Sequence, residues 1–155
     1  MPFTNSNDYL TGRKPTVFPA GAEVVAVRYP IALVAADLDE NDIGAVGTLP
    51  AGCVPVGVLV DSDDLDTNAQ PTIALAVGVL NATGDDLSTA AADGGAAWGT
   101  GLTVAQAGGQ VQVLSKALSR VAATGADRTV ALKVTTAAAT KAAGTVGVTL
   151  LYRAA

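Results

Sequence analysis

Residues 23–33 read EVVAVRYPIAL, and this stretch decides how the chain folds. From Val25 onward every second residue is apolar, and with Glu23 these residues would share one face of a strand: Glu23, Val25, Val27, Tyr29, Ile31 and Leu33. Because side chains alternate between the two faces of a β-strand, this spacing predicts a strand with one face against a core. Pro30 has no backbone N–H to donate, which favours an edge strand or two strands joined by a kink.

The same alternation recurs along the chain, most clearly at residues 54–60, 73–79, 130–134 and 146–152. Polar or glycine-rich turns separate these stretches, among them 37–42, 81–86 and 124–127. The pattern predicts about eight short strands with turns roughly every 8–12 residues, which is typical of an antiparallel sandwich or barrel. The sequence lacks the alternation of strands with long helices that is typical of a parallel sheet.

Residues 88–110 are less clearly patterned. The segment 102–107, followed by Gly108 and Gly109, predicts a short helix with a glycine cap, and 116–121 is ambiguous between helix and strand. Trp98 lies among glycines. It either anchors this segment to the sandwich or serves as a contact hot spot at an interface.

The chain has 155 residues, no histidine and a single cysteine. A Ser-His-Asp triad and a histidine or thiolate zinc site are therefore excluded, and we expect no catalytic residues, metal or cofactor. Cys53 has no disulfide partner in the chain, and its apolar surroundings predict a small buried hydrophobe.

The acidic segment 61–68 is the remaining candidate for chemistry. It begins like a calcium loop at Asp64, but Ala69 occupies the position of the turn glycine and Leu75 that of the closing acid. We interpret it as a solvated hairpin tip, with weak cation binding as a minor alternative.

The formal net charge is −5, and no basic run occurs. This argues against nucleic-acid binding and against docking on an anionic membrane. The apolar stretches end well before the ~18 residues that a membrane span requires, and the polar N-terminus is unlike a secretory signal. We therefore expect a soluble protein made in a cytoplasm, with residues 22–155 forming one domain.

Residues 1–21 lack periodicity but hold three of the six aromatic residues of the chain, Phe3, Tyr9 and Phe18. Disordered segments are usually poor in aromatic residues. The segment is either a disordered tail or an extended arm that docks on a partner.

Several segments resemble a family of small tailed-phage virion proteins, the capsid decoration or cement proteins. They are 9–15 (YLTGRKP), 17–23 (VFPAGAE), 41–55 (NDIGAVGTLPAGCVP), 61–68 (DSDDLDTN), 77–81 (VGVLN) and 144–153 (GTVGVTLLYR). The resemblance implies an all-β fold, an antiparallel β-sandwich of jelly-roll type with an extended N-terminal arm. It also implies a homotrimer on the outer capsid surface that clamps adjacent major capsid protein subunits against the pressure of packaged DNA.

In this hypothesis the arm binds the capsid through Phe3, Tyr9, Arg13, Lys14 and Phe18. The cations would pair with capsid carboxylates, and the aromatic rings would fill grooves. The alternative is a carbohydrate-binding or host-attachment module displayed on the virion, with Trp98 and the segment 61–68 as its site. A hydrolase that uses a pair of aspartates is a third interpretation.

Overall fold

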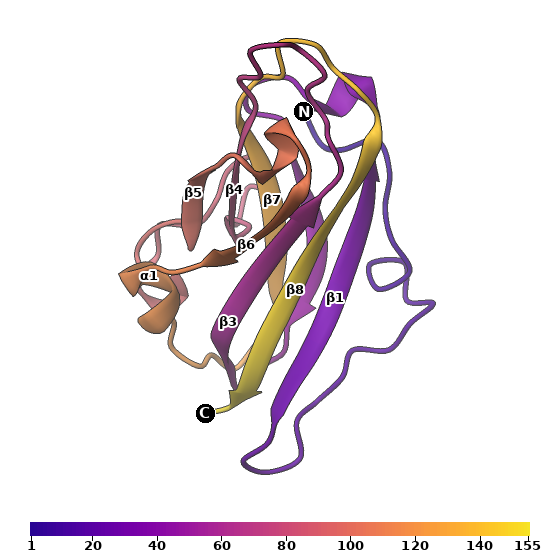
Figure 1. The fold of residues 1–155 in the computed structure, drawn as a ribbon. Coiled ribbons are helices and arrows are strands. Elements are labelled where there is room, and N and C mark those ends of the chain that lie inside the picture. Colours follow the sequence, from indigo (N-terminus) through magenta and orange to yellow (C-terminus); the bar gives the residue numbers. More distant parts are fainter.

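The structure is a computed structural model that describes all 155 residues. Two four-stranded antiparallel sheets pack face to face (Figure 1). The strands are β1 (Val24–Leu33), β2 (Ile43–Leu49), β3 (Cys53–Ser62), β4 (Ala74–Val79), β5 (Gly99–Leu102), β6 (Gly109–Val113), β7 (Arg128–Thr136) and β8 (Gly144–Ala154). The helical pieces are one turn each: α1 (Lys116–Ser119) and the 3₁₀ turns Ala35–Asp37, Ala91–Asp93 and Val104–Gln106.

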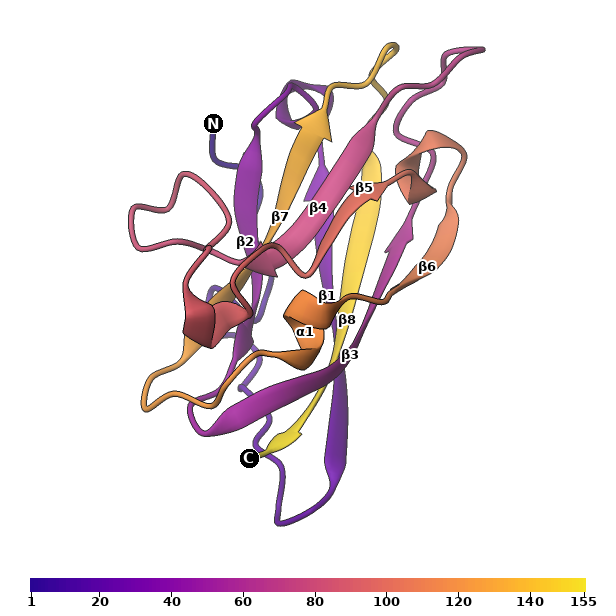
Figure 2. The same ribbon diagram turned by 90° about the vertical axis from the view of Figure 1, so that its left-hand side faces the viewer.

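The strand orders are β1-β8-β3-β6 in the first sheet and β2-β7-β4-β5 in the second. Counted from the β1 and β2 edge, each position in one sheet corresponds to a position in the other. The strands at corresponding positions are consecutive in the chain: β1 with β2, β7 with β8, β3 with β4, and β5 with β6. This is the arrangement of an eight-stranded jelly roll. Figure 2 shows the second sheet, with β2 and β5 at its two edges. The prediction of an antiparallel jelly-roll sandwich is confirmed.

The inward face of β1 is the one that the sequence predicts. Val27, Tyr29, Ile31 and Leu33 are buried, whereas Val24, Ala26 and Arg28 are exposed. β1 passes through Pro30 as a single strand, paired with β8 alone. Since an edge strand has one unpaired side, the missing N–H of Pro30 costs no ladder hydrogen bond there. The edge-strand alternative is therefore confirmed.

The helix predicted over 102–107 is wrong. Leu102 ends β5, and only Val104–Gln106 forms a 3₁₀ turn. The carbonyl of Ala105 accepts a hydrogen bond from the backbone N–H of Leu65, 2.9 Å away, and the Gln106 side chain donates to the carbonyl of Ile73. These contacts with distant loops replace the hydrogen bonds of a longer helix.

Candidate functional site

The N-terminal segment runs along one side of the sandwich, over the edge strands β1 and β2 (Figure 1). Phe3 N–H donates to the carbonyl of Ile43 at 3.2 Å, and Ile43 N–H donates to the carbonyl of Met1 at 3.0 Å. The side-chain amide of Asn7 donates to the carbonyls of Pro30 on β1 and Val46 on β2, at 3.0 and 2.7 Å. The segment therefore covers edges of both sheets, which protects them from pairing with other chains.

A buried carboxylate holds the start of this segment. Asp37 is almost fully buried, and its Oδ1 accepts hydrogen bonds from the backbone N–H and the hydroxyl of Thr4, at 2.8 and 2.7 Å. Its Oδ2 accepts from the N–H of Val34 at 3.0 Å. Asp37 thus belongs to the docking of the arm, and not only to the polar turn that the sequence predicts.

Two of the five arm residues predicted to bind a capsid pack on the chain's own sandwich. The Phe3 ring lies against Gly44, where a Cβ atom would collide with it. The Tyr9 ring meets Tyr29 edge to face, with centroids 4.9 Å apart and planes at 82°, a favourable geometry for an aromatic pair. Both side chains are only partly exposed, so their aromatic contacts are already made within the chain.

The other three arm residues are exposed. The Arg13 side chain is 79% exposed and lies 3.8 Å from a carboxylate oxygen of Asp8. Lys14 Nζ lies 5.5 Å from the centre of the Tyr9 ring, a cation–π contact, and makes no ion pair. Phe18 is 60% exposed.

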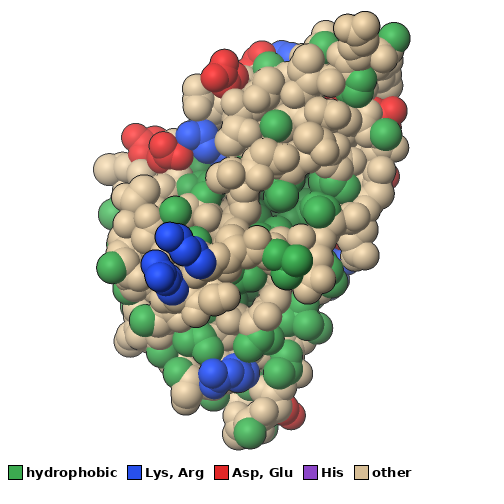
Figure 3. Space-filling model, turned by 60° about the vertical axis from the view of Figure 1, so that its left-hand side comes forward, with side chains coloured by type: hydrophobic (Ala, Val, Ile, Leu, Met, Phe, Trp, Pro, Cys, Tyr) green, Lys and Arg blue, Asp and Glu red, His purple; other side chains and the backbone are tan.

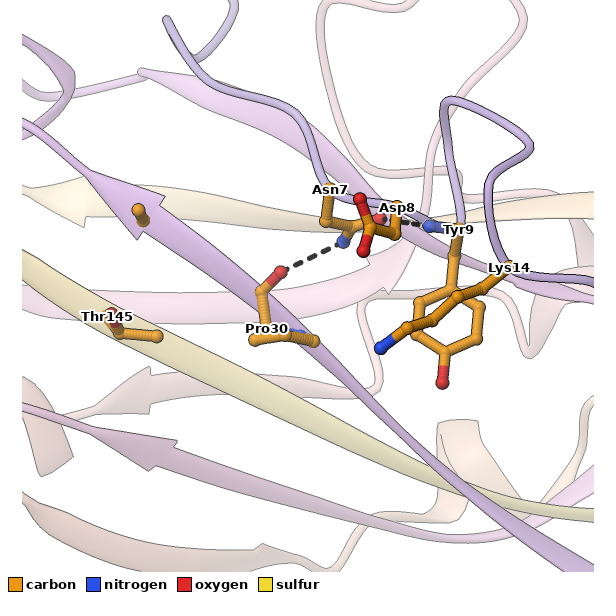
Figure 4. Close-up of a pocket in the computed structure, with 7 residues that line it drawn as sticks. Asn7, Asp8, Tyr9, Lys14, Pro30 and Thr145 are labelled. Atoms are coloured by element: carbon orange, nitrogen blue, oxygen red, sulfur yellow. Dashed lines mark hydrogen bonds between the residues drawn. The ribbon is translucent and has the colours of Figure 1, made fainter.

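Between the arm and the first sheet lies a shallow pocket of about 290 Å³ (Figure 4). Its lining includes Asn7, Tyr9 and Lys14 from the arm, Pro30 from β1 and Thr145 from β8. Figure 4 shows Lys14 extended beside the Tyr9 ring, and the hydrogen bond from Asn7 to Pro30. The arm is therefore a docked strap with an exposed basic tip at residues 13 and 14.

The segment 61–68 is not simply a solvated hairpin tip. Asp66 is 1% exposed, and its Oδ2 accepts from the backbone N–H groups of Thr72, Ile73 and Ala139. Its Oδ1 accepts from the N–H of Thr140 at 2.8 Å. Burial alone would raise the pKa of this carboxyl, but these four hydrogen bonds to the ionised form hold the pKa well below its usual range. Asp66 therefore joins two loops, and the sequence-based interpretation of this residue is wrong.

Trp98 is completely buried, and its indole N–H donates to the carbonyl of Asp93 at 3.0 Å. Asp93 in turn forms a 3.2 Å ion pair with Arg128, which is also largely buried. The indole therefore anchors the glycine-rich segment to the sandwich, the first of the two roles considered. Its ring is not free for the interface or the carbohydrate platform that the other interpretations require.

The opposite side of the sandwich has a feature that the sequence did not single out. β5 and β6 are the other edges of the two sheets, and Leu114, directly after β6, is 81% exposed. Grooves of about 320 and 280 Å³ flank it. The signal was present in the pair Val113-Leu114, because adjacent strand residues face opposite sides and only one of the two can enter the core.

Cys53 is buried, as predicted, and burial raises the pKa of its thiol. No group of three or more acidic, cysteine or histidine residues is placed to hold a metal ion. None of the helices is long and apolar enough to cross a membrane.

No model of a known protein family matches the chain, and no curated protein sequence does. Solved structures do match it. A chain in the capsid of Ralstonia phage GP4 is 34% identical, with 97% of each chain covered and a TM-score of 0.80. A chain in the cyanophage Pam1 capsid asymmetric unit is 29% identical, with 98% of each covered and a TM-score of 0.61. A chain in the capsid of Helicobacter pylori bacteriophage KHP30, 13% identical with a TM-score of 0.52 over 84% of this chain and 90% of that one, shares the fold.

The jelly-roll sandwich and these neighbours define the class: a structural protein of a virion. The sequence identity to the Ralstonia phage GP4 chain extends over nearly the whole length of both proteins. The protein therefore belongs to the same family of bacteriophage capsid proteins as that GP4 chain.

Proposed function

We propose that this protein binds the outer surface of a phage capsid as an oligomer, most simply a trimer, and clamps adjacent major capsid protein subunits against internal DNA pressure. The observation that carries the proposal is the end-to-end similarity to a chain of the Ralstonia phage GP4 capsid, arm included. A sandwich with a strap along one side fits a protein that grips its neighbours.

The exposed tip of the arm supplies the contacts in this proposal. Arg13 and Lys14 are neighbouring exposed cations in a chain of net charge −5, and they suit carboxylates on capsid subunits. A single exposed ion pair contributes only about 0.2–1 kcal/mol. Several arms on one oligomer would add their contributions, because each later contact forms within a complex already bound.

In this proposal Phe3 and Tyr9 act indirectly. Phe3 and Tyr9 keep the arm docked, so their part in capsid binding is to position its tip. The carbohydrate-binding alternative places its site at Trp98 and the segment 61–68. Asp63 and Asp64 of that segment are exposed, but the Trp98 ring that would serve as the platform is buried.

The test replaces Arg13 and Lys14 with glutamine and leaves the docked residues intact. The double variant should remain folded and bind capsid shells at least tenfold more weakly, measured as copies bound per sedimented particle. The control, Ala82→Glu with Ala126→Glu, makes the same change in net charge in exposed turns outside the arm. Equal decoration by the double variant and wild type would eliminate the basic tip as the contact. A wild-type protein that never binds shells would refute the proposed function itself.

A further inference from the structure

Apart from Met1 at the N-terminus, the exposed large apolar side chains fall into two groups. Val17, Phe18 and Val24 lie at the end of the arm and the start of β1, and Val56 and Leu114 lie on β3 and just after β6. β1 and β6 are the two outer strands of the first sheet, so Val24 and Leu114 lie toward opposite edges of it, whereas Val56 lies on β3, which only β8 separates from β1. Single exposed apolar residues are common, but Leu114 stands between two grooves that offer room for a side chain of a partner.

The group around Leu114 has a basic character. One flanking groove is lined by Pro55, Val56 and Leu118, and α1 carries exposed Lys116 and, at its end, exposed Arg120. Neither cation forms an ion pair within the chain, and no acidic residue occurs in 43–60 or 94–126. Figure 3 shows this side, with basic and apolar side chains over its middle and acidic ones mainly toward its upper edge.

The group around Phe18 carries an acid. Glu23 is exposed, forms no ion pair, and accepts a hydrogen bond from the N–H of Ala20 at 2.6 Å, which ties the turn together. The buried Tyr152 hydroxyl donates to the carbonyl of Val17, so the turn is fixed to the sandwich. Arg153, opposite Val24 on β8, is an exposed cation that forms no ion pair; its guanidinium donates a hydrogen bond to the carbonyl of Ala154, the next residue in the chain.

A two-fold contact between two Leu114 groups would bring Lys116 and Arg120 close to their own copies, and like charges repel. The Phe18 group suits this surface better, because it offers an exposed aromatic ring for a groove and the Glu23 carboxylate for the two cations. Contacts between two different surfaces of the same chain are heterologous, and they close into a ring when the rotation permits.

We propose that copies of this chain associate head to tail in solution, with Phe18 of one copy in a groove beside Leu114 of the next and Glu23 facing Lys116 and Arg120. This deepens the proposed function, because it specifies the contact that builds the oligomer and assigns Phe18 to it. The capsid contact stays with residues 13 and 14.

The experiment measures the solution mass of the full chain by light scattering over a range of concentrations. Wild type should exceed the 15.3 kDa of one chain, and both Leu114→Asp and Phe18→Asp should dissociate about tenfold or more readily. The matched control Ala82→Asp, at an exposed turn, should behave as wild type. Circular dichroism checks that the variants fold.

Mixing the two variants gives the decisive result. Each variant keeps one intact surface, so the mixture should form complexes of two chains and no larger ones. Independently, Lys116→Glu with Arg120→Glu should weaken association, and Glu23→Lys added to that pair should restore part of it.

A wild-type monomer at every concentration, unchanged masses for the single variants, or a mixture that stays monomeric would overturn the inference. Shell binding is measured on the same samples. A chain that is monomeric in solution but decorates shells overturns the inference and leaves capsid binding, the central part of the proposed function. An oligomer that does not bind shells overturns the proposed function and leaves the inference.

Discussion

The guanidinium of Arg28 on β1 and the carboxylate of Asp61 on β3 meet above Gly147 of β8, the strand between them. The contact is bidentate, with Nε–Oδ1 at 2.9 Å and Nη2–Oδ2 at 2.5 Å. Hydrogen bonding to Asp61 raises the pKa of Arg28 above its usual value. A Cβ atom on Gly147 would lie only 2.5 Å from Arg28 Nε, so the glycine is what allows two non-adjacent strands to pair their charges.

Gly147→Ala should therefore separate this ion pair at small cost. The atoms that a methyl group would meet are the ends of flexible, half-exposed side chains, and exposed pairs contribute about 0.2–1 kcal/mol. We expect the free energy of unfolding to fall by no more than ~1 kcal/mol, measured by urea denaturation.

Gly47→Ala is the matched comparison and should cost more. Here the new methyl group would meet the ring of Tyr29, which is buried and donates its hydroxyl proton to the carbonyl of Thr48 at 2.9 Å. Overpacking of a core costs about 1–3 kcal/mol. Equal losses for the two alanine variants would contradict this account of the glycines.

Asp66→Asn should destabilise the protein by about 3 kcal/mol. The amide offers one acceptor oxygen in place of two, and its NH₂ group would face backbone N–H donors that are left without a partner. Asp64→Asn, at an exposed position whose Oδ1 accepts only from the Asp66 N–H, is the control and should cost less than ~1 kcal/mol.

The same carboxylate predicts a dependence of stability on pH. The native pKa of Asp66 lies below its value of about 4 in the unfolded chain, so the stabilisation is complete above that value and is lost as the pH falls toward the native pKa. Wild type should lose stability between pH 5 and 2 more steeply than Asp66→Asn, measured from denaturation midpoints. Parallel curves would show that Asp66 does not contribute to the acid response.

Asn7→Ala should release the arm while the sandwich stays folded. The Asn7 amide donates to both sheet edges, and its Oδ1 accepts from the N–H groups of Tyr9 and Leu10, both at 3.1 Å. We expect faster proteolysis within residues 1–21 and a loss of about 1–2 kcal/mol in global stability. Asn7→Asp keeps the oxygen that accepts from Tyr9 and Leu10 but loses the N–H groups that donate to Pro30 and Val46. It therefore separates the contribution of the accepted bonds from that of the donated bonds. Unchanged cleavage in both variants would mean that Asn7 does not hold the arm.

Trp98→Phe should cost about 1–3 kcal/mol, because the carbonyl of Asp93 loses its indole donor and the smaller ring leaves a void. As the single tryptophan, Trp98 also reports its own burial. Acrylamide should quench its fluorescence weakly in the native state and strongly after unfolding. Strong quenching of the native protein would contradict the buried position.

The sequence predicts the parts of this molecule that depend on local periodicity. A two-residue repeat is visible in the chain itself, so the inward residues of β1 and β8, the antiparallel sandwich and the burial of Cys53 could all be predicted. The histidine-free composition likewise limits the available chemistry without any knowledge of the fold. Resemblance to capsid decoration proteins added the jelly-roll topology.

Only the tertiary structure decided what each polar or isolated residue meets. Asp66 reads as a loop acid until residues 139 and 140, more than seventy positions away, bring their N–H groups to it. Phe3 and Tyr9 read as anchors for a partner until Gly44 and Tyr29 receive them. Trp98 could be a buried anchor or an interface contact until the fold buries it, and Leu114, which the sequence did not single out, lies at the surface. The physical reason is that strand periodicity is a property of neighbouring residues, whereas burial and hydrogen bonding of a single side chain depend on segments that only folding brings together.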